Sequence, residues 1–330
     1  MTGDVRALRR VKLRELRILI AVSQHGSLAN AAEQLAMSQP AVSKAISDLE
    51  DAMGVRLFDR TNRGAEPTEQ GRIAIQHAVN MLDELRQSSE EIDFLADPMS
   101  GELRVWTTVG LAGGILPLVL DTINRERPGI HSSIMEGELE ELGPLLRART
   151  IDVALSRMPP LSAGGDIVFD RLFEDRLFAV VGAGHPLSRR RKVSLKELAG
   201  ARWIIPFPDT SVHARLRAAF DGLGIAMPEA VMAAMSLHLR YELVLTDRYV
   251  TTLPGSLLLF GNAHTAAHVL PVDLPGGAPT GITTLKGRSL SPVAKLFVEC
   301  ARKASRAIEG LDARGLRSAL LRRRDPQSLT

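Results

Sequence analysis

The sequence predicts an α/β protein with an all-α winged helix-turn-helix module at its N-terminus. Three observations predict this fold class. Two short amphipathic helical patterns lie between Ser27 and Arg63, a long heptad-spaced helix follows Pro67, and short strands alternate with helices from Gly101 onward. The chain has 330 residues, 45% of them apolar and 24% charged, which suits two to three globular domains.

The first two patterns form a pair of short helices joined by a polar turn. The first helix places small and aliphatic residues on one face: Leu28, Ala31, Ala32 and Leu35. In the second helix the buried positions, spaced i, i+4 and i+7, are Val42, Ile46 and Leu49. Ser38 is a good N-cap for this helix, and Pro40 stands where a helix tolerates a missing N–H.

The second helix leaves a face of short polar side chains and one cation: Gln39, Ser43, Lys44 and Ser47. Such a face suits a helix in the DNA major groove, whose N-terminal residues reach base edges. The alternative is a small helical module with a solvated polar face. The predicted DNA-binding residues are Ser27, Ser38, Gln39, Pro40, Ser43, Lys44, Arg60 and Arg63.

The net charge of +3 is modest, so affinity for DNA depends on where the cations lie. Six crowd the first helix and its approach: Arg6, Arg9, Arg10, Lys12, Arg14 and Arg17. Arg56, Arg60 and Arg63 follow the second helix and can contact phosphates. Arg60 and Arg63 lie on a predicted wing, where they could also enter a narrow minor groove. A last cluster of arginines, between residues 314 and 324, is interpreted as a solvated tail.

The segment SLANAAEQLAMSQPAVSKAISDLEDAMGVRLFDRTNRG resembles the helix-turn-helix of LysR-type transcriptional regulators. Its AAEQL, SQPAVSKAI and G-RLF-R blocks stand in the order and spacing of that family, and the match runs without a gap from about Leu13 to Gly71. Pro67 departs from the family pattern, which more often has an aliphatic residue before Thr68. We interpret this proline as a stiffer hinge.

A long helix is predicted from Thr68 to about Asp97. Its heptad seam is Gly71, Ile75, Ala78, Leu82, Leu85, Ser89 and Ile92. About thirty residues at 1.5 Å each give a length of about 45 Å. The resemblance implies that two such helices pair antiparallel in a dimer, with tetramers as the larger assembly. The alternative is a monomeric helix packed on its own domain.

The part after Gly101 predicts an α/β domain with mostly parallel sheets. The resemblance implies a two-lobed effector domain similar to periplasmic binding proteins. Lobe 1 is expected at about 101–172 and 277–309, and lobe 2 at about 173–276, with AVVGAGHPLS as the segment that crosses between them. The expected division is a DNA-binding domain at 1–67, a linker helix at 68–98, an effector domain at 99–309 and a basic tail at 310–330.

Ligands of open α/β sheets lie beyond the carboxyl ends of the strands. The predicted effector-binding residues at those ends are Thr107, Thr108, Arg157, Phe207, Thr210 and Ser211. Hydroxyls, helix N-termini and one cation suit a small polar or carboxylated effector. Asp209 would repel a carboxylate, which leaves a sugar or sugar acid open. The hydroxyls could instead be helix caps, and Arg157 could pair with Asp152 or Glu136.

Other functional classes lack their signatures. The sequence contains no G-x-x-x-x-G-K-[ST] phosphate loop and no G-x-S-x-G elbow, so no enzyme is predicted. His264 and His268 lack the glutamate of a zinc motif, and neither a metal nor a cofactor is expected. The single Cys300 fits a buried role in a reducing cytoplasm. LRILIAV is too short for a signal peptide, and no apolar run could span a membrane.

We therefore expect a cytoplasmic regulator that binds double-stranded DNA and is gated by a small-molecule effector of unknown identity. Self-association is expected, and the resemblance also implies RNA polymerase as a partner. A solute-binding protein is the second interpretation, opposed by the helix-turn-helix and by the absent signal peptide. An enzyme with a DNA-binding head is the third, opposed by the missing catalytic motifs.

Overall fold

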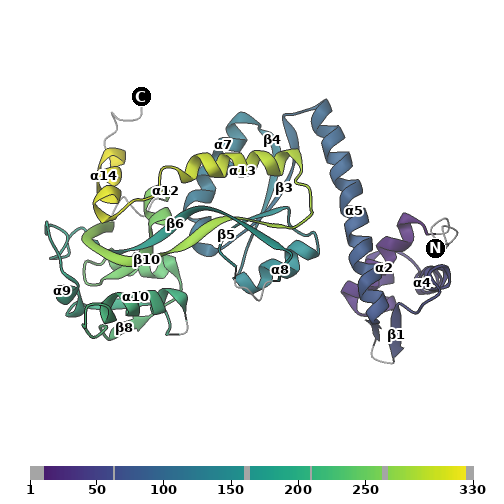
Figure 1. The fold of residues 1–330 in the computed structure, drawn as a ribbon, viewed down its shortest axis with the longest axis horizontal. Helices are drawn as coiled ribbons and strands as arrows, with labels where there is room; N and C mark the ends of the chain where they lie inside the picture. Colours follow the sequence, from purple (N-terminus) through teal and green to yellow (C-terminus); the bar gives the residue numbers. More distant parts are fainter. Residues whose placement is uncertain (1–10, 62–63, 160–163, 209, 262–266, 325–330) are drawn as a thin grey trace. The chain divides into compact units, whose positions relative to one another are not determined.

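The computed structural model describes residues 11–61, 64–159, 164–208, 210–261 and 267–324. The chain forms two compact units (Figure 1). One comprises Met1–Ala96 with Arg147–Thr150, and the other comprises Asp97–Leu146 with Ile151–Thr330.

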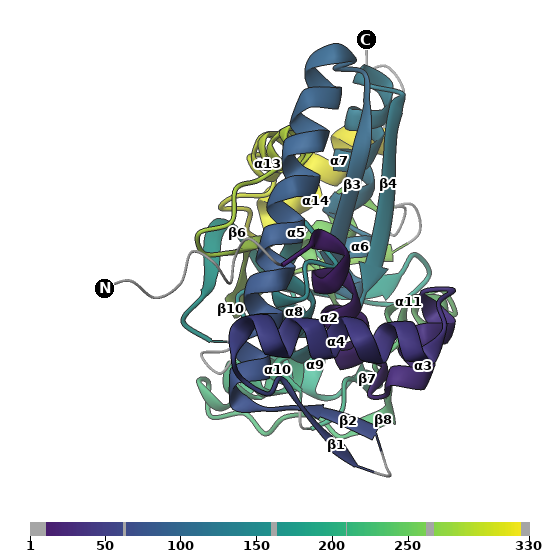
Figure 2. The same ribbon diagram turned by 90° about the vertical axis from the view of Figure 1, so that its right-hand side faces the viewer.

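Three helices and a hairpin make the N-terminal head. They are α2 (Leu13–His25), α3 (Leu28–Gln34), α4 (Gln39–Met53) and the antiparallel strands β1 (Phe58–Thr61) and β2 (Gly64–Pro67). The hairpin projects beside the helices as the wing (Figure 2). The predicted apolar face of α4 is confirmed, since Val42, Ile46 and Leu49 are fully buried.

The long helix α5 (Glu69–Ala96) begins where the sequence predicts. Thr68 caps it, because its hydroxyl accepts a hydrogen bond from the Gly71 N–H (2.9 Å) and donates to the Arg56 carbonyl (2.8 Å). Gly71 also allows the helix to approach the wing closely. A Cβ there would lie only 1.9 Å from the Leu57 carbonyl oxygen, so a side chain would push the two elements apart.

The predicted heptad seam divides between two faces of α5. In its first half, Gly71 and Ala78 are buried, and Ile75 and Leu82 are half-buried. Ile75, Ala78 and Leu82 pack against the core of their own head. This half matches the alternative of a helix packed on its own domain. The reason is that α2 already covers this face.

A second set of apolar side chains on α5 is exposed within this chain. It comprises Ile73, Met81, Leu85, Ile92 and Leu95, and we call it the α5 stripe. Successive residues of an α-helix are rotated by about 100° about its axis. On this geometry the centre of the α5 stripe is separated from the centre of the buried face by about 100° around the axis. Two residues of the predicted seam, Leu85 and Ile92, therefore belong to this outward stripe.

The second unit is built on a six-stranded sheet of order β4-β3-β5-β10-β6-β9. Its strands are β3 (Ser100–Thr107), β4 (Gly129–Glu136), β5 (Val153–Arg157), β6 (Ile167–Gly182), β9 (Thr251–Pro254) and β10 (Ala267–Leu285). A separate parallel pair is β7 (Trp203–Ile205) and β8 (Ala230–Ala233). The helices are α6 (Val109–Ala112), α7 (Ile115–Glu126), α8 (Leu139–Arg147), α9 (Leu195–Ala199), α10 (Ser211–Asp221), α11 (Leu237–Val244), α12 (Gly255–Phe260), α13 (Pro292–Ser305) and α14 (Ala313–Arg324).

The expectation of mostly parallel strands holds for β4, β3 and β5 and for the separate pair of β7 and β8. The two long strands β6 and β10 instead pair antiparallel with each other. They run through the whole domain as one ribbon (Figure 1). The predicted crossing segment AVVGAGHPLS lies only partly in this ribbon: residues 179–182 form the end of β6, whereas its His-Pro-Leu follows that strand.

Buried apolar residues form separate cores toward the two ends of this ribbon. One contains Trp106, Leu142, Leu146 and Leu285. The other contains Leu177, Trp203, Phe220 and Leu274. These cores fall within the residue ranges expected for lobe 1 and lobe 2, and the lobe boundaries stay a prediction.

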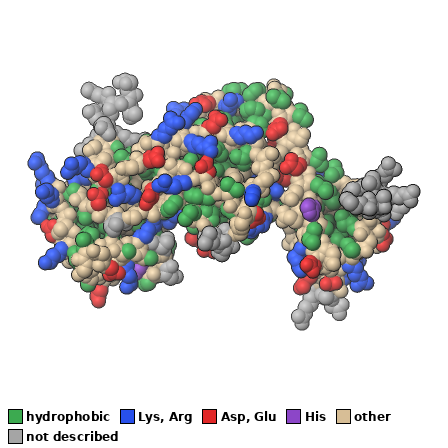
Figure 3. Space-filling model, viewed as in Figure 1, with side chains coloured by type: hydrophobic (Ala, Val, Ile, Leu, Met, Phe, Trp, Pro, Cys, Tyr) green, Lys and Arg blue, Asp and Glu red, His purple; other side chains and the backbone are tan. Residues whose placement is uncertain are grey.

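The C-terminal segment differs from the expected solvated tail. It folds as α14, which buries Leu316 and Leu320 and donates a hydrogen bond from the Ala313 N–H to Asp273 (3.0 Å). Arg317 lies between these two buried leucines in the sequence. Lys and Arg side chains are also frequent over this end of the domain (Figure 3).

Candidate DNA-binding face and effector pocket

The outer face of α4 presents the side chains predicted to meet bases. Gln39, Pro40 and Lys44 are exposed, and Ser43 is half-buried. Gln39 and Ser43 are one helical turn apart and so lie on the same face. Because no bulky apolar side chain interrupts this face, the start of α4 can approach a groove closely.

The wing is tied to the end of α4 by a single carboxylate. Oε1 of Glu50 accepts hydrogen bonds from the backbone N–H groups of Leu57 (2.7 Å) and Phe58 (3.2 Å). Its Oε2 pairs with the Arg60 guanidinium at 3.3 Å, and Arg60 also donates to the Ser43 hydroxyl at 3.3 Å. Arg60 therefore lies against α4 in this structure, while Arg63 lies outside the described residues.

Two predicted DNA-binding residues have a structural role in the head. The Ser27 hydroxyl accepts a hydrogen bond from the Asn30 N–H (3.1 Å) and caps α3. The Ser38 hydroxyl accepts one from the Ala41 N–H (3.4 Å) and caps α4. Caps of this kind orient the helix start, which is the part that would face the DNA.

A pocket of about 600 Å³ lies beyond the carboxyl ends of β3 and β5. Three predicted effector-binding residues line it: Thr108, Arg157 and Thr210. Apolar walls come from Leu139 and Leu237, among others. The Thr210 hydroxyl also caps α10, where it accepts a hydrogen bond from the His213 N–H (3.2 Å).

The other predicted effector residues are placed differently. Thr107 is fully buried and donates to the Leu155 carbonyl (2.9 Å), because it belongs to the interior of the sheet. Phe207 is exposed and does not line this pocket. Ser211 begins α10, but its side chain lies outside the described part of the chain, as does Asp209.

Of the two alternative partners expected for Arg157, Asp152 and Glu136, the first is bound by other residues. Asp152 binds Arg104 at 2.7 Å and Arg288 at 3.0 Å. It thus forms a buried charge network in lobe 1. Among the described carboxylates, none lies within ion-pair distance of Arg157, whose Nε is buried without an acceptor.

Arg240, which was not predicted from the sequence, lines the same pocket from α11. Only 4% of its surface is exposed, and its guanidinium donates to the Thr252 carbonyl at 3.0 Å. The sequence does contain a pattern that points to this residue. One helix face, at spacings of 3 and 4, carries Leu237, Arg240 and Val244. A cation on an otherwise apolar face marks a buried polar site.

The charges around the pocket perturb one another. Burial, together with the charge of Arg157, lowers the pKa of Arg240 to about 10. Burial and Arg157 also lower the pKa of Arg215. The buried Asp175 accepts hydrogen bonds from the Ser256 N–H (3.0 Å) and hydroxyl (2.7 Å), and burial raises its pKa.

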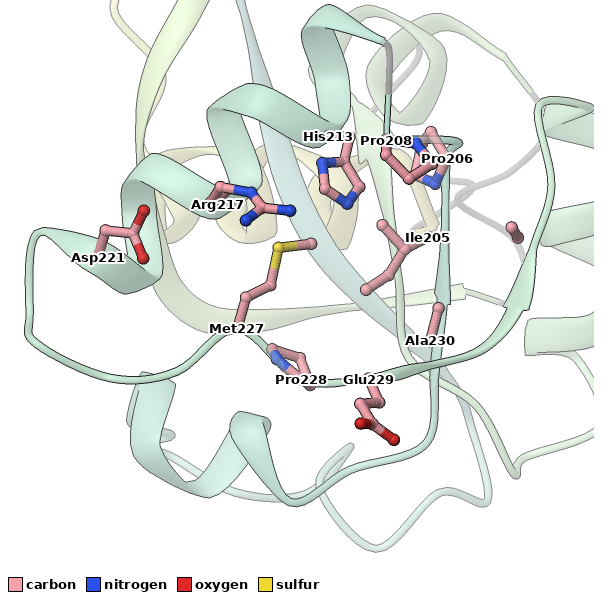
Figure 4. A pocket seen from close by; sticks show the side chains of 11 residues that line it. Ile205, Pro206, Pro208, His213, Arg217, Asp221, Met227, Pro228, Glu229 and Ala230 are labelled. Atoms are coloured by element: carbon pink, nitrogen blue, oxygen red, sulfur yellow. The ribbon is translucent and has the colours of Figure 1, made fainter.

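A second, smaller hollow of about 290 Å³ lies between α10 and the segment that leads into β8 (Figure 4). His213 and Arg217 point into it from successive turns of α10, opposite Met227 (Figure 4). No residue predicted from the sequence to bind DNA or effector lines this hollow.

Neither a metal cluster nor a membrane span is found in the described ranges. Their His, Cys, Asp and Glu side chains form no group of three that could hold a metal ion. None of the described helices combines the length and apolar character needed to cross a membrane.

Comparison with family models matches nearly the whole chain. Residues 13–72 match the bacterial regulatory helix-turn-helix protein of the lysR family, and residues 96–306 match the LysR substrate binding domain. A relative in Azospirillum brasilense, the HTH-type transcriptional regulator GbpR, is 30% identical over 90% of this chain and 87% of its own length. The uncharacterized HTH-type transcriptional regulator YdcI of Escherichia coli is 28% identical over 89% of this chain and 96% of its own.

Solved structures share the fold at low sequence identity. A full-length variant of OxyR from Pseudomonas aeruginosa aligns with a TM-score of 0.60 at 20% identity, covering 88% of this chain and 97% of that one. Full-length CbnR complexed with its target DNA aligns with a TM-score of 0.52 at 23% identity, covering 89% and 100%. These likenesses support the two-part fold described above.

Proposed function

This chain belongs to the LysR family of bacterial transcriptional regulators, and from that premise we propose that a small polar or anionic effector gates its DNA binding. It is a DNA-binding regulator with a substrate-binding domain rather than an enzyme. The effector occupies the pocket beyond β3 and β5. The observation that carries this proposal is a set of buried hydrogen-bond donors around that pocket, Thr108 Oγ1, Arg157 Nε and Arg240 Nε, which no described residue satisfies.

The DNA contact is assigned to α4 and the wing. Gln39 and Ser43 read base edges in the major groove, and Lys44 contacts phosphate. Arg60 reaches phosphate only by leaving Glu50, while Arg63 is assigned a phosphate or minor-groove contact on its sequence position alone. Ser27, Ser38 and Pro40 position the helix start near the DNA backbone.

The α5 stripe is assigned to self-association. Five large apolar side chains on one face of a long helix are costly to leave in water, and a second copy of the same helix covers them symmetrically. A dimer built this way carries two heads and reads a two-fold site. Tetramers follow when two dimers pack through their effector domains.

Effector binding is coupled to DNA binding through the assembly. When the lobes close, the packing of effector domains changes, and with it the spacing of the heads and the bend of the DNA. A regulator of this kind acts on the chromosome in the cytoplasm, with RNA polymerase as a further partner. The division into a head (1–67), linker helix (68–98), effector domain (99–309) and basic C-terminal segment (310–330) belongs to the same proposal.

The test is a footprint of the purified chain on DNA upstream of its own gene. The expected result is a protected two-fold site whose extent or bend changes with one member of a panel of small carboxylates, phosphate esters and sugars. The matched control is Arg125→Gln, an exposed cation of α7 paired with Asp121, which should leave the footprint unchanged. Identical footprints and bend angles with a compound that demonstrably binds would overturn the gating.

A further inference from the structure

A run of cations surrounds α9 and takes no part in the functions proposed above. The segment 183–202 contains six cations and one carboxylate, Glu197, and the turn 246–249 adds one of each. Together these residues carry a net charge of +5, whereas the whole chain carries only +3. We call the cations of these two segments the α9 patch: Arg189, Arg190, Arg191, Lys192, Lys196, Arg202 and Arg248. The positive balance of the chain is therefore concentrated here more than the overall charge suggests.

Hydrogen bonds and ring contacts bring the two segments together. The Gly184 N–H donates to Asp247 Oδ1 at 2.8 Å. The guanidinium carbons of Arg202 and Arg248 each lie 5.6 Å from the centroid of the Tyr249 ring. The α9 patch is thus one surface. The end of the domain at which α9 lies in Figure 1 shows many Lys and Arg side chains in Figure 3.

The turn that carries most of these cations is anchored to the domain. The Ser188 N–H donates to the His185 carbonyl at 2.9 Å, and the Ser188 hydroxyl donates to the Ala183 carbonyl at 2.8 Å. Val193 and Leu195 are buried in the adjacent apolar core. The backbone therefore has little freedom to lose when the cations meet a partner, which favours binding.

Most charges of the α9 patch have no counter-charge. Glu197 pairs with Arg190 at 2.9 Å, and its other oxygen accepts a hydrogen bond from the Ser194 N–H at 2.8 Å as part of the α9 cap. Within the described ranges no carboxylate forms an ion pair with four exposed cations, which we call the unpaired cations: Arg189, Arg191, Lys192 and Lys196. These four side chains are available to an anionic partner.

The chemistry of this surface favours duplex phosphates over a protein or a single strand. Protein interfaces place apolar and aromatic anchors at their centre. In the segment 183–202, which the structure describes throughout, no large apolar side chain is exposed. Single-stranded nucleic acid stacks its bases on exposed aromatic rings, but Trp203 and Tyr249 are buried. Duplex DNA carries closely spaced phosphates, for which cations alone suffice.

We propose that the α9 patch is a second DNA-contact surface, through which the effector domain binds duplex phosphates without regard to sequence. The heads already hold the chain on DNA, so weak phosphate contacts elsewhere on the same chain form at a high effective concentration. Such contacts add affinity and salt dependence but no base choice. They need no effector, so they are independent of the gating proposed above.

Site-directed cross-linking tests whether the patch touches DNA. The single natural cysteine, Cys300, is buried, so a thiol-specific photo-cross-linker labels an exposed introduced cysteine preferentially. In the full chain, Lys192→Cys should cross-link to duplex DNA. Lys295→Cys, at an exposed position of α13, is the matched control and should give only background yield.

The salt dependence of binding measures how much the unpaired cations contribute. Each phosphate contact adds about 0.9 to the slope of log binding constant against log salt concentration, so Arg189→Gln/Arg191→Gln/Lys192→Gln/Lys196→Gln should lower the slope by about 2–4 for each copy bound. The matched control removes four exposed cations elsewhere in the domain: Arg125→Gln/Lys286→Gln/Lys295→Gln/Lys303→Gln. Both variants have the same net charge, so their difference reports a local contact. All eight side chains are exposed, so both variants should fold.

Two results would overturn the proposal: equal cross-linking from residues 192 and 295, and equal salt slopes in the two fourfold variants. A patch variant that binds DNA like its control but no longer binds poly-glutamate would also overturn it and assign the surface to an acidic protein. Both measurements use the footprinted fragment and a duplex of unrelated sequence. Failure to find a protected two-fold site would overturn the proposed operator binding, whereas a slope that depends on the patch on the unrelated duplex would still support the phosphate contact.

Discussion

Replacing Glu50 with alanine should release the wing from the DNA-binding head. Glu50 is near the end of α4, and its one carboxylate holds the Leu57 and Phe58 N–H groups as well as Arg60. Leu57 and Phe58 are buried, so water cannot fully replace the lost acceptor. The wing would then open without unfolding the helices.

The size of the effect follows from three contacts. A hydrogen bond to a charged group contributes about 1.5–3 kcal/mol, and the two here differ in length, so we expect about 2–4 kcal/mol together. The Arg60 pair is 40% exposed on the arginine side and adds at most about 1 kcal/mol. The sum is about 2–5 kcal/mol, and since about 1.4 kcal/mol is tenfold, local opening should rise by about 30-fold to several thousand-fold.

The assay is amide hydrogen exchange of the full chain, read by mass spectrometry on the peptide that contains Leu57 and Phe58. Glu50→Gln keeps an acceptor oxygen without charge and should exchange at an intermediate rate. Arg60→Gln removes the ion pair and the exposed hydrogen bond to Ser43, and it should change exchange by less than about fivefold. Equal exchange in Glu50→Ala and Arg60→Gln would refute the view that the carboxylate holds the wing through its backbone bonds.

Four further predictions concern other parts of the molecule. Gln39→Ala should reduce the preference for one base at one position of the DNA site by about 1–3 kcal/mol, as titrations on DNA sites with single base changes can show. Lys44→Gln should instead weaken binding to all sites alike, and it should lower the slope of log binding constant against log salt concentration by about 1. Gly71→Ala should destabilise the head by about 3 kcal/mol, seen as an earlier helix melt in circular dichroism, because the added methyl meets a carbonyl. Asp152→Ala leaves two guanidiniums without their shared carboxylate and should cost about 3–5 kcal/mol in urea unfolding followed by tryptophan fluorescence. Burial raises the pKa of Asp175 in the folded protein above its ordinary 3.8, so the free energy of unfolding falls as pH rises from 3.8 to the raised value. Asp175→Asn should remove this fall from the pH dependence of the free energy of unfolding.

The local elements of the head were predictable because each follows from short-range rules. Ser38 caps α4, Val42 and Ile46 mark its buried face, and Thr68 begins α5. Interactions between distant residues were not predictable in this way. Nothing local shows that Arg60 would pair with Glu50, or that Gly71 serves the approach of α5 to Leu57.

The effector pocket was predicted only in part for the same reason. Thr108 and Arg157 follow strands, so the strand-end rule found them. That rule cannot tell which of two adjacent residues faces the cavity, and Thr107 faces the sheet interior instead. Arg240 comes from a helix far along the chain, and only the tertiary fold brings it to Arg157.

The ribbon of β6 and β10 also has a consequence for the order in which the domains form during synthesis. The three helices and the wing of the head have all been made by Pro67, and the lobe 2 core lies within the continuous stretch from Leu177 to Leu274. The lobe 1 core includes Leu285, and β5 pairs with β10. Lobe 1 therefore completes its folding last, although its first strand is synthesised before lobe 2. At about 5–20 residues per second, β3 waits on the order of ten to forty seconds on the ribosome for its sheet to be completed.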